Sequence, residues 1–145
     1  VIIKVSSQWV LIDIAKKRPA MLSKYFPEYT PLNERALPVD FMKIKEPDSF
    51  EREDEFKVRF DDIDINNHVN NSIYPLWASE CTDVDFRLTH VPAELEINFK
   101  KSAVYGDKIA VLTARKQNDT FHSIRESDKT TELSRCRIKW RKITL

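Results

Sequence analysis

The middle of the chain contains a polar loop that leads into a predicted helix. The stretch runs Phe60-Asp61-Asp62-Ile63-Asp64-Ile65-Asn66-Asn67-His68-Val69-Asn70-Asn71-Ser72-Ile73-Tyr74-Pro75-Leu76-Trp77. Asp64, Asn66 and His68 occupy every second position, so an extended loop can place a carboxylate, an amide and an imidazole on one side. Hydrolysis of ester-type bonds uses such groups to activate water, to orient the reactants and to shuttle a proton. The alternative is a structural loop, because Asp and Asn before a helix are usually caps.

The residues after this loop predict one helix. Four of them share helical spacing: Ile73, Leu76, Trp77 and Glu80. The helix is expected over about residues 69–82, with Asn70 or Asn71 as its cap. Pro75 is compatible with it only in the first turn. The N-terminus of the helix would offer backbone N–H groups and a positive dipole end to an oxyanion.

The segments on both sides of this region predict β-strands. Before the loop, Phe56, Val58 and Phe60 alternate with polar residues. After the helix, four segments are rich in alternating or β-branched residues: 93–99, 108–117, 120–126 and 131–143. The expected fold is α+β, in the order strand, helix and four strands in a meander, and the helix must bury its apolar stripe against the sheet.

The N-terminal third has a different pattern. Residues 1–13 alternate between apolar and polar side chains, which predicts a strand. Residues 19–47 contain five prolines among scattered aromatic residues. This composition indicates an ordered linker that wraps a surface, with one helical turn near residues 21–25.

Composition excludes several classes of protein. The chain has 145 residues, of which 41% are hydrophobic, enough for a folded core. Its net charge of +1 excludes a globally basic nucleic-acid binder, and its single glycine, Gly106, excludes Gly-rich phosphate loops. No apolar run approaches the ~20 residues that a membrane span requires.

The two cysteines and the N-terminus bear on the expected location. Cys81 and Cys136 lie far apart and form no metal-binding pair, so we expect no disulfide framework, a core position for Cys81, and a reducing, cytoplasmic location. No long apolar region follows Val1, so we expect no signal peptide. Because the chain does not begin with Met, we expect a fragment or a processed protein.

A basic stripe lies near the C-terminus. It consists of Arg135, Arg137, Lys139 and Arg141. Alternation places these four side chains on one face of a strand. They form either a solvated face that pairs across strands with Glu94 and Glu96, or a docking surface for an acidic partner. His90 and His122 are isolated histidines, and the sequence assigns them no role.

The stretch from residue 60 to residue 77 resembles the signature of acyl-acyl carrier protein thioesterases of bacteria and plastids. Those enzymes have Asp-x-Asn-x-His-Val-Asn-Asn, followed by Tyr and Trp on the helix. The family is built from two hotdog domains in tandem, each an antiparallel sheet wrapped around one central helix. Ser6-x-x-Trp9 and the following Lys-Arg-Pro segment resemble the last strand of the first hotdog and the linker after it. The resemblance therefore implies that residues 1–47 are that strand and linker, and that residues 48–145 are the catalytic hotdog domain.

The resemblance also implies roles for individual residues. Asp64 matches the catalytic aspartate, Asn66 the orienting asparagine and His68 the catalytic histidine of the family. Asn70, Asn71 and Ser102 are possible accessory residues of this site. Plant members have glutamate followed by cysteine where this chain has Ser102 and Ala103. Ser102 can hold a water molecule but cannot act as a carboxylate base.

The expected function is hydrolysis of the thioester between a fatty acyl chain and the phosphopantetheine arm of an acyl carrier protein, in fatty acid biosynthesis, without a metal or cofactor. The expected partners are this carrier and either an N-terminal hotdog domain or a second copy of the chain. The strand edge formed by residues 93–103 would pair with that domain or copy. We therefore expect that the 145 residues do not form a well-behaved monomer by themselves. One alternative is a single-hotdog acyl-CoA thioesterase, whose Arg-Phe-x-Asp-x-Asp-x-x-x-His-Val-Asn-Asn pattern residues 59–71 also satisfy. The segment before residue 48 argues against it. The other is a non-catalytic acyl-binding hotdog protein, which the missing glutamate keeps open.

Overall fold

The structure, a computed structural model, describes residues 3–30, 34–38 and 40–144. The chain divides into two compact units, Val1–Met42 and Lys43–Leu145. The second unit carries the polar loop and the sheet.

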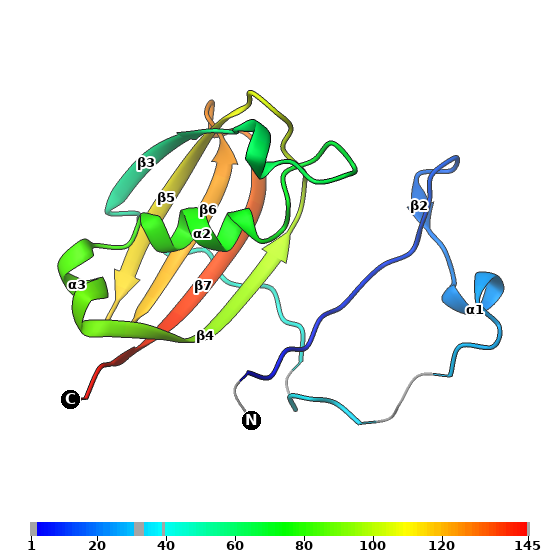
Figure 1. Cartoon of the computed structure of the whole chain (residues 1–145), viewed down its shortest axis with the longest axis horizontal. Helices are drawn as coiled ribbons and strands as arrows, with labels where there is room; N and C mark the ends of the chain where they lie inside the picture. Colours follow the sequence, from blue (N-terminus) through cyan, green and yellow to red (C-terminus); the bar gives the residue numbers. More distant parts are fainter. Residues whose placement is uncertain (1–2, 31–33, 39, 145) are drawn as a thin grey trace. The chain divides into compact units, whose positions relative to one another are not determined.

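The second unit is an antiparallel sheet with one helix across one face (Figure 1). Its elements are β3 (Arg52–Lys57), η1 (Phe60–Asp62), α2 (Ile73–Glu80), α3 (Val84–Thr89), β4 (His90–Phe99), β5 (Lys108–Lys116), β6 (Asp119–Glu126) and β7 (Glu132–Lys142). The strand order is β3-β5-β6-β7-β4, and every neighbouring pair is antiparallel. This confirms the α+β arrangement of a sheet around one central helix.

The predicted four-strand meander is wrong in one respect. β5, β6 and β7 form a meander, but β4 pairs with β7 at the far edge of the sheet and not with β5. Residues 100–107 therefore carry the chain across the ends of β7 and β6 to reach β5 beside β3. Gly106 helps to close this crossover with a φ of +87°, a conformation that a residue without Cβ adopts without strain. Because β4 is an edge strand, the predicted association through it stays a prediction.

The central helix is shorter than the sequence predicted. α2 begins at Ile73, because Val69 pairs with Ile63 and residues 70–72 form a turn in which the Asn70 side chain accepts hydrogen bonds from the backbone and hydroxyl of Ser72. Pro75 is the third helical residue and lies in the first turn, as required. α3 was not predicted. It is capped by the Asp83 side chain, which accepts from the Phe86 amide at 2.9 Å.

The first unit contains less regular structure than the sequence predicted. The strand expected over residues 1–13 is wrong for residues 3–11, and residues 1–2 lie outside the described part. Only β1 (Ile12–Asp13) pairs, with β2 (Arg18–Pro19), while α1 (Leu22–Tyr25) confirms the helical turn. Alternation predicts a strand only where a partner strand is available, and Trp9 is 81% exposed. The assignment of residues 1–47 to a preceding domain stays a prediction.

The core lies between α2 and the sheet. Tyr74 and Trp77 project from the helix, and Trp77 stacks on Phe56 of β3 at a centroid distance of 5.9 Å. Buried aliphatic side chains of the sheet complete this layer: Val58, Ile109, Val111, Ile124 and Leu133. Because side chains alternate along β3 and β5, the apolar side chains of both strands lie on the face of the sheet that packs against α2.

A buried network of hydrogen-bonded side chains lies on the same face of the sheet. His122 is fully buried and shares hydrogen bonds with the hydroxyls of Thr113 (3.0 Å) and Thr120 (2.9 Å). The Trp140 indole donates to the Thr120 hydroxyl at 2.9 Å. Because burial disfavours the imidazolium, the pKa of His122 is lowered to about 4.

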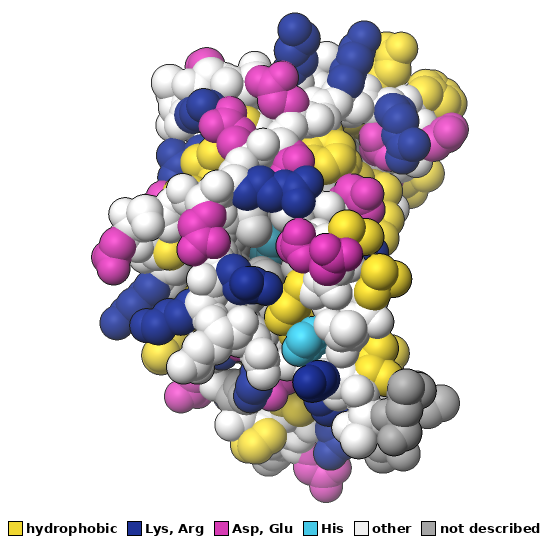
Figure 2. Space-filling model, turned by 90° about the vertical axis from the view of Figure 1, so that its left-hand side faces the viewer, with side chains coloured by type: hydrophobic (Ala, Val, Ile, Leu, Met, Phe, Trp, Pro, Cys, Tyr) yellow, Lys and Arg dark blue, Asp and Glu magenta, His cyan; other side chains and the backbone are white. Residues whose placement is uncertain are grey.

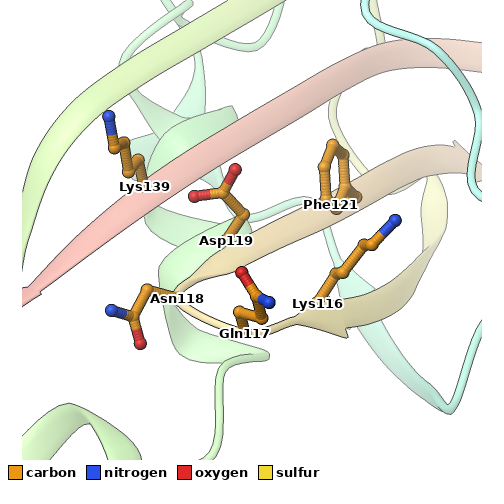
Figure 3. A pocket seen from close by; sticks show the side chains of 6 residues that line it. All are labelled: Lys116, Gln117, Asn118, Asp119, Phe121 and Lys139. Carbon is orange, nitrogen blue, oxygen red and sulfur yellow. The ribbon is translucent and has the colours of Figure 1, made fainter.

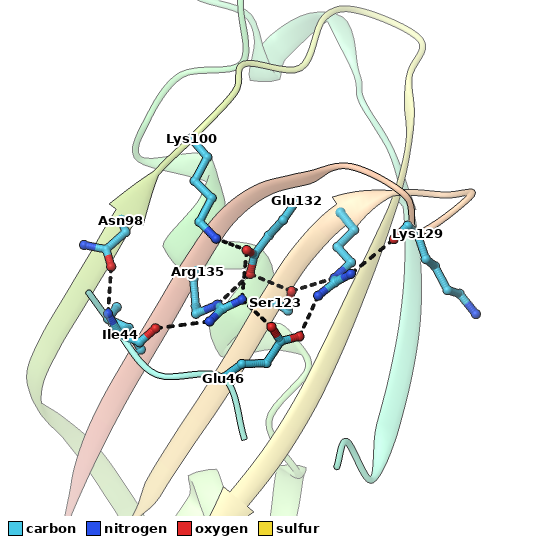
Figure 4. Close-up of polar contacts among 9 residues, drawn as sticks. Ile44, Glu46, Asn98, Lys100, Ser123, Lys129, Glu132 and Arg135 are labelled. Atoms are coloured by element: carbon cyan, nitrogen blue, oxygen red, sulfur yellow. Dashed lines mark hydrogen bonds and ion pairs between the residues drawn. The ribbon is translucent and has the colours of Figure 1, made fainter. Parts of the chain in front are cut away.

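A short strap crosses the opposite face of the sheet (Figure 4). The Ile44 amide donates to the Asn98 side chain at 2.9 Å, and Arg135 donates to the Ile44 carbonyl at 3.2 Å. Arg125 and Arg135 both donate to the Glu46 carboxylate, at 2.6 and 2.7 Å. Ile44 is buried as a result, so the end of the Pro-rich segment wraps a surface, as predicted.

Two leucines allow a matched test of the core. Leu133 is 1% exposed, whereas Leu88 of α3 is 72% exposed. We expect Leu133→Ala to lower the free energy of unfolding by about 2–5 kcal/mol, because it opens a cavity under α2. Leu88→Ala should change it by less than about 0.5 kcal/mol. Urea titration measures both, and equal effects would contradict this assignment of the core.

His122 predicts a dependence of stability on pH. The unfolded chain takes up a proton near pH 6.5, whereas folded His122 does so only near pH 4. The free energy of unfolding should therefore fall as the pH falls through this window, by roughly 3 kcal/mol at most from this residue. Urea titration at pH 7 and pH 4.5 should give a smaller difference for His122→Gln than for the unchanged chain. The same difference in both proteins would show that folded His122 titrates normally.

Candidate active site

The polar loop is a tight turn closed by backbone hydrogen bonds. Ile63 and Val69 form an antiparallel bridge, and inside it the Asp64 amide donates to the His68 carbonyl at 2.8 Å. Asn67 has a φ of +60°, a left-handed conformation that asparagine tolerates better than most residues. The turn therefore brings Asp64, Asn66 and His68 together within one short loop.

Asp64 shapes this turn. Its Oδ1 accepts a hydrogen bond from the Asn66 amide at 2.8 Å and a longer one from the His68 amide at 3.4 Å. The carboxylate is half-buried, and its Oδ2 has no hydrogen bond to a described residue. Asp64 thus performs the structural role of a turn cap while one oxygen remains available.

The side chains of Asn66 and His68 are exposed. Neither side chain has a hydrogen-bonding partner among the residues that the structure describes, although the backbone of both residues is engaged. Functional side chains without internal partners on a loop of fixed backbone are available to a substrate.

The loop is anchored at its base by the backbone of Ala103. The Val69 amide donates to the Ala103 carbonyl at 2.9 Å, and the Ala103 amide donates to the Tyr74 hydroxyl at 3.2 Å. Tyr74 is 1% exposed, and burial raises its pKa, so its hydroxyl stays protonated. Tyr74 and Ala103 lie at positions that the family resemblance covers, but the sequence analysis assigned neither of them a role in holding the loop.

Asp62 supports the other side of the loop. Its carbonyl accepts from the Asn70 amide at 2.8 Å, and its buried carboxylate accepts from the backbone and guanidinium of Arg59 at 2.8 and 2.9 Å. Burial acts to raise the pKa of Asp62, but the hydrogen bonds from Arg59 outweigh it and leave the pKa below its ordinary value. Asp62 is therefore a charged structural residue, which sequence reasoning did not identify.

The accessory candidates lie close to the loop along the chain. Ser102 directly precedes Ala103, is exposed, and has no hydrogen bond to a described residue. Asn70 uses its side-chain oxygen to hold Ser72, which gives it a structural task at the start of α2. Asn71 is exposed beside it.

The helix terminus offers fewer free donors than the sequence suggested. The amides of Ser72 and Ile73 already donate to Asn70, at 2.9 Å each. Pro75 in the first turn has no N–H group. An oxyanion would therefore depend on other donors around the loop in addition to the helix dipole.

Most of the basic stripe is engaged in ion pairs across the sheet. Arg137 contacts Asp119 and Glu96, at 2.7 and 3.1 Å, and Lys139 contacts Glu94 at 3.0 Å. Arg135 contacts Glu46 and Glu132. The contacts to Glu94 and Glu96 are those of the solvated-face alternative, and Arg141 alone in the stripe has no ion pair in the described part of the chain. Elsewhere on the surface, the face seen in Figure 2 likewise has basic and acidic side chains interspersed.

One end of this stripe borders an open pocket of about 400 Å³ (Figure 3). It is lined by Lys116, Gln117, Asn118, Asp119, Phe121 and Lys139. The pocket lies at the β5–β6 hairpin, at the end of β5 away from the crossover that leads to the polar loop. It contains none of the residues of the loop.

Both cysteines and one further histidine have structural roles. Cys81 and Cys136 are buried free thiols, and burial raises the pKa of each to about 12, which keeps them unreactive. The His90 ring stacks on Phe86 at 4.0 Å.

Among the described residues, no group of three or more His, Cys, Asp or Glu side chains is placed to hold a metal ion, and no helix is long and apolar enough to cross a membrane.

A model of the family described as acyl-ACP thioesterase C-terminal domain matches residues 44–142. A comparison with curated protein sequences gives no match.

Several solved structures are similar. An acyl-ACP thioesterase from Bacteroides thetaiotaomicron has a TM-score of 0.75 and 16% identity, over 90% of this chain and 53% of that chain. A 12:0-ACP thioesterase from Umbellularia californica has a TM-score of 0.75 and 15% identity, over 91% and 53%. A 1,4-dihydroxy-2-naphthoyl-CoA thioesterase from Synechocystis has a TM-score of 0.55 and 15% identity, over 64% and 82%. The chain thus spans about half the length of the first two, and the likeness confirms the predicted hotdog fold.

Proposed function

Because the chain belongs to the acyl-ACP thioesterase C-terminal domain family, we propose that the unit Lys43–Leu145 is the hydrolytic domain of a thioesterase. Its substrate is a fatty acyl chain linked to the phosphopantetheine arm of an acyl carrier protein, and its product is a free fatty acid of fatty acid biosynthesis. The first 47 residues lead from a preceding hotdog domain and form the linker to this one.

The single observation that carries this proposal is the turn of Asp64, Asn66 and His68. The backbone of the turn is held by hydrogen bonds, whereas the side chains of Asn66 and His68 are exposed and unengaged in the described structure. The fixed backbone positions these residues before the substrate binds, and their free side chains can then contact it. Such an arrangement is suited to catalysis.

The residues have distinct roles in this proposal. His68 removes a proton from water, and the resulting hydroxide adds to the thioester carbonyl. The tetrahedral intermediate then expels the thiolate, which takes up the proton from His68. Asp64 keeps the loop in shape and acts with His68 in driving the addition of water, while Asn66 orients the carbonyl. Ser102 holds the attacking water by a hydrogen bond, in place of a carboxylate.

A second candidate function is hydrolysis of acyl-CoA. The pattern of residues 59–71 and the likeness to a CoA thioesterase that covers 82% of that chain both support it. The N-terminal segment of residues 1–42 favours the carrier-protein substrate, since it forms a unit of its own before the hotdog. A non-catalytic acyl-binding protein is the outcome if no thioester is cleaved.

Substitutions in the turn test the catalytic assignment. We expect Asp64→Asn and His68→Ala to lower the turnover of acyl thioesters by roughly 10²-fold or more, the usual scale for the loss of an acid–base group. Asn at position 64 keeps an oxygen that can accept the backbone hydrogen bonds, so the loop should keep its shape. Release of free thiol measures the rate with acyl carrier and acyl-CoA substrates.

The matched control is Asp61→Asn, which removes an exposed carboxylate from the same stretch without touching the turn. It should leave turnover within about twofold of the unchanged protein. Near-normal hydrolysis by both turn variants would show that the active site lies elsewhere.

The basic stripe tests the carrier substrate separately. We propose that its exposed end, Lys139 and Arg141, attracts the acidic carrier. Lys139→Glu with Arg141→Glu should raise the KM for acyl carrier substrates by about tenfold at low salt, and the effect should shrink as salt screens the charges. Small thioester substrates should be unaffected. Equal effects on both kinds of substrate would contradict a docking role.

A further inference from the structure

Residues 100–103, the first half of the crossover, connect the sheet to the candidate active site. At its start, the amides of Lys100 and Lys101 both donate to the Leu133 carbonyl, at 2.8 and 3.1 Å. At its end, the Ala103 carbonyl holds the Val69 amide at 2.9 Å. The position of this segment therefore sets where the polar loop is held.

Side-chain ion pairs hold residues 100–103 in place beyond the end of the backbone pairing between β4 and β7. β4 ends at Phe99, so the segment beyond it is not part of a strand. Lys100 pairs with Glu132 of β7, and Lys101 pairs with Glu126 of β6 at 2.6 Å. These two lysines attach the crossover to the strands that it passes.

Glu132 is the centre of the larger of these contacts (Figure 4). Its carboxylate accepts hydrogen bonds from Arg135 at 2.6 and 2.9 Å, from the Ser123 hydroxyl at 2.8 Å, and from Lys100. The side chains of Glu132 and Arg135 are only 11% and 12% exposed, and Arg135 continues the network to Glu46 of the strap. A carboxylate held by this many donors has little freedom to move.

The setting of Glu132 differs from that of an ordinary surface ion pair. The Lys139–Glu94 pair on the same sheet is about half exposed on both sides, and such pairs contribute little. Without Glu132, the cations Lys100 and Arg135 would lie close together without their shared anion, and Lys100 would move away.

We propose that Glu132 is a positioning residue for the active site. It holds Lys100, and through the crossover it sets the Ala103 carbonyl that fixes the loop of Asp64 and His68. The effect on catalysis rests on the proposed thioesterase function, whereas the effect on the loop does not.

Amide hydrogen exchange of the full chain tests the positioning. In Glu132→Gln, we expect the Val69 and Ala103 amides to exchange about tenfold faster than in the unchanged protein, because their hydrogen bonds open more often. Glu94→Gln, which removes the exposed pair with Lys139, should leave both rates unchanged. Unchanged exchange at both amides in Glu132→Gln would overturn the proposal.

Kinetics provide the second readout. Glu132→Gln should lower kcat for a small acyl thioester roughly tenfold and leave KM within about twofold, because a displaced catalytic loop affects the reaction more than binding. An unchanged kcat would overturn the proposal. If the unchanged protein cleaves no thioester, the proposed function fails, and the exchange rates still decide the role of Glu132.

A milder variant covers the case in which Glu132→Gln does not fold. Lys100→Gln removes the link from the side of the exposed lysine and leaves the Glu132–Arg135 pair in place. It should accelerate exchange of the Val69 and Ala103 amides in the same way. Exchange rates equal to those of the unchanged protein would overturn the proposal as well.

Discussion

The arrangement of the site depends on the backbone of one buried residue, Ala103. Its carbonyl holds the Val69 amide at the end of the polar loop, and its amide donates to the hydroxyl of Tyr74 on the central helix. Loop, helix and crossover therefore meet at a single residue. Because a buried backbone group without a partner costs free energy, these contacts constrain all three elements together.

The two faces of the sheet perform different tasks. The face toward α2 is largely apolar, includes the hydrogen bonds around His122, and provides the burial that stabilises the domain. The opposite face carries ion pairs and the strap of Ile44 and Glu46. Since the strands are shared, a polar contact on the outer face can restrain the crossover that supports the loop.

The site follows the general division between a rigid scaffold and a functional loop. The sheet and α2 determine where the loop starts and ends, while Asp64 determines the shape of the turn between those points. The catalytic candidates Asn66 and His68 contribute little to the core, so they are free to vary their contacts with a substrate. The same separation explains why Asp62, which is buried, supports the loop without belonging to its chemistry.

Local sequence alone determined the strands around the loop and the helical stripe of α2, because each depends on spacing over a few residues. It predicted an extended loop for Asp64, Asn66 and His68, whereas the structure has a tight turn there. It also placed Arg137 and Lys139 on one face of their strand, since alternation fixes the face of a side chain. Only the tertiary structure decided that β4 pairs with β7, that residues 3–11 form no strand and that Glu132 joins Lys100 to Arg135. These features depend on partners distant in the chain, and alternation is the same whichever strand, or none, lies alongside.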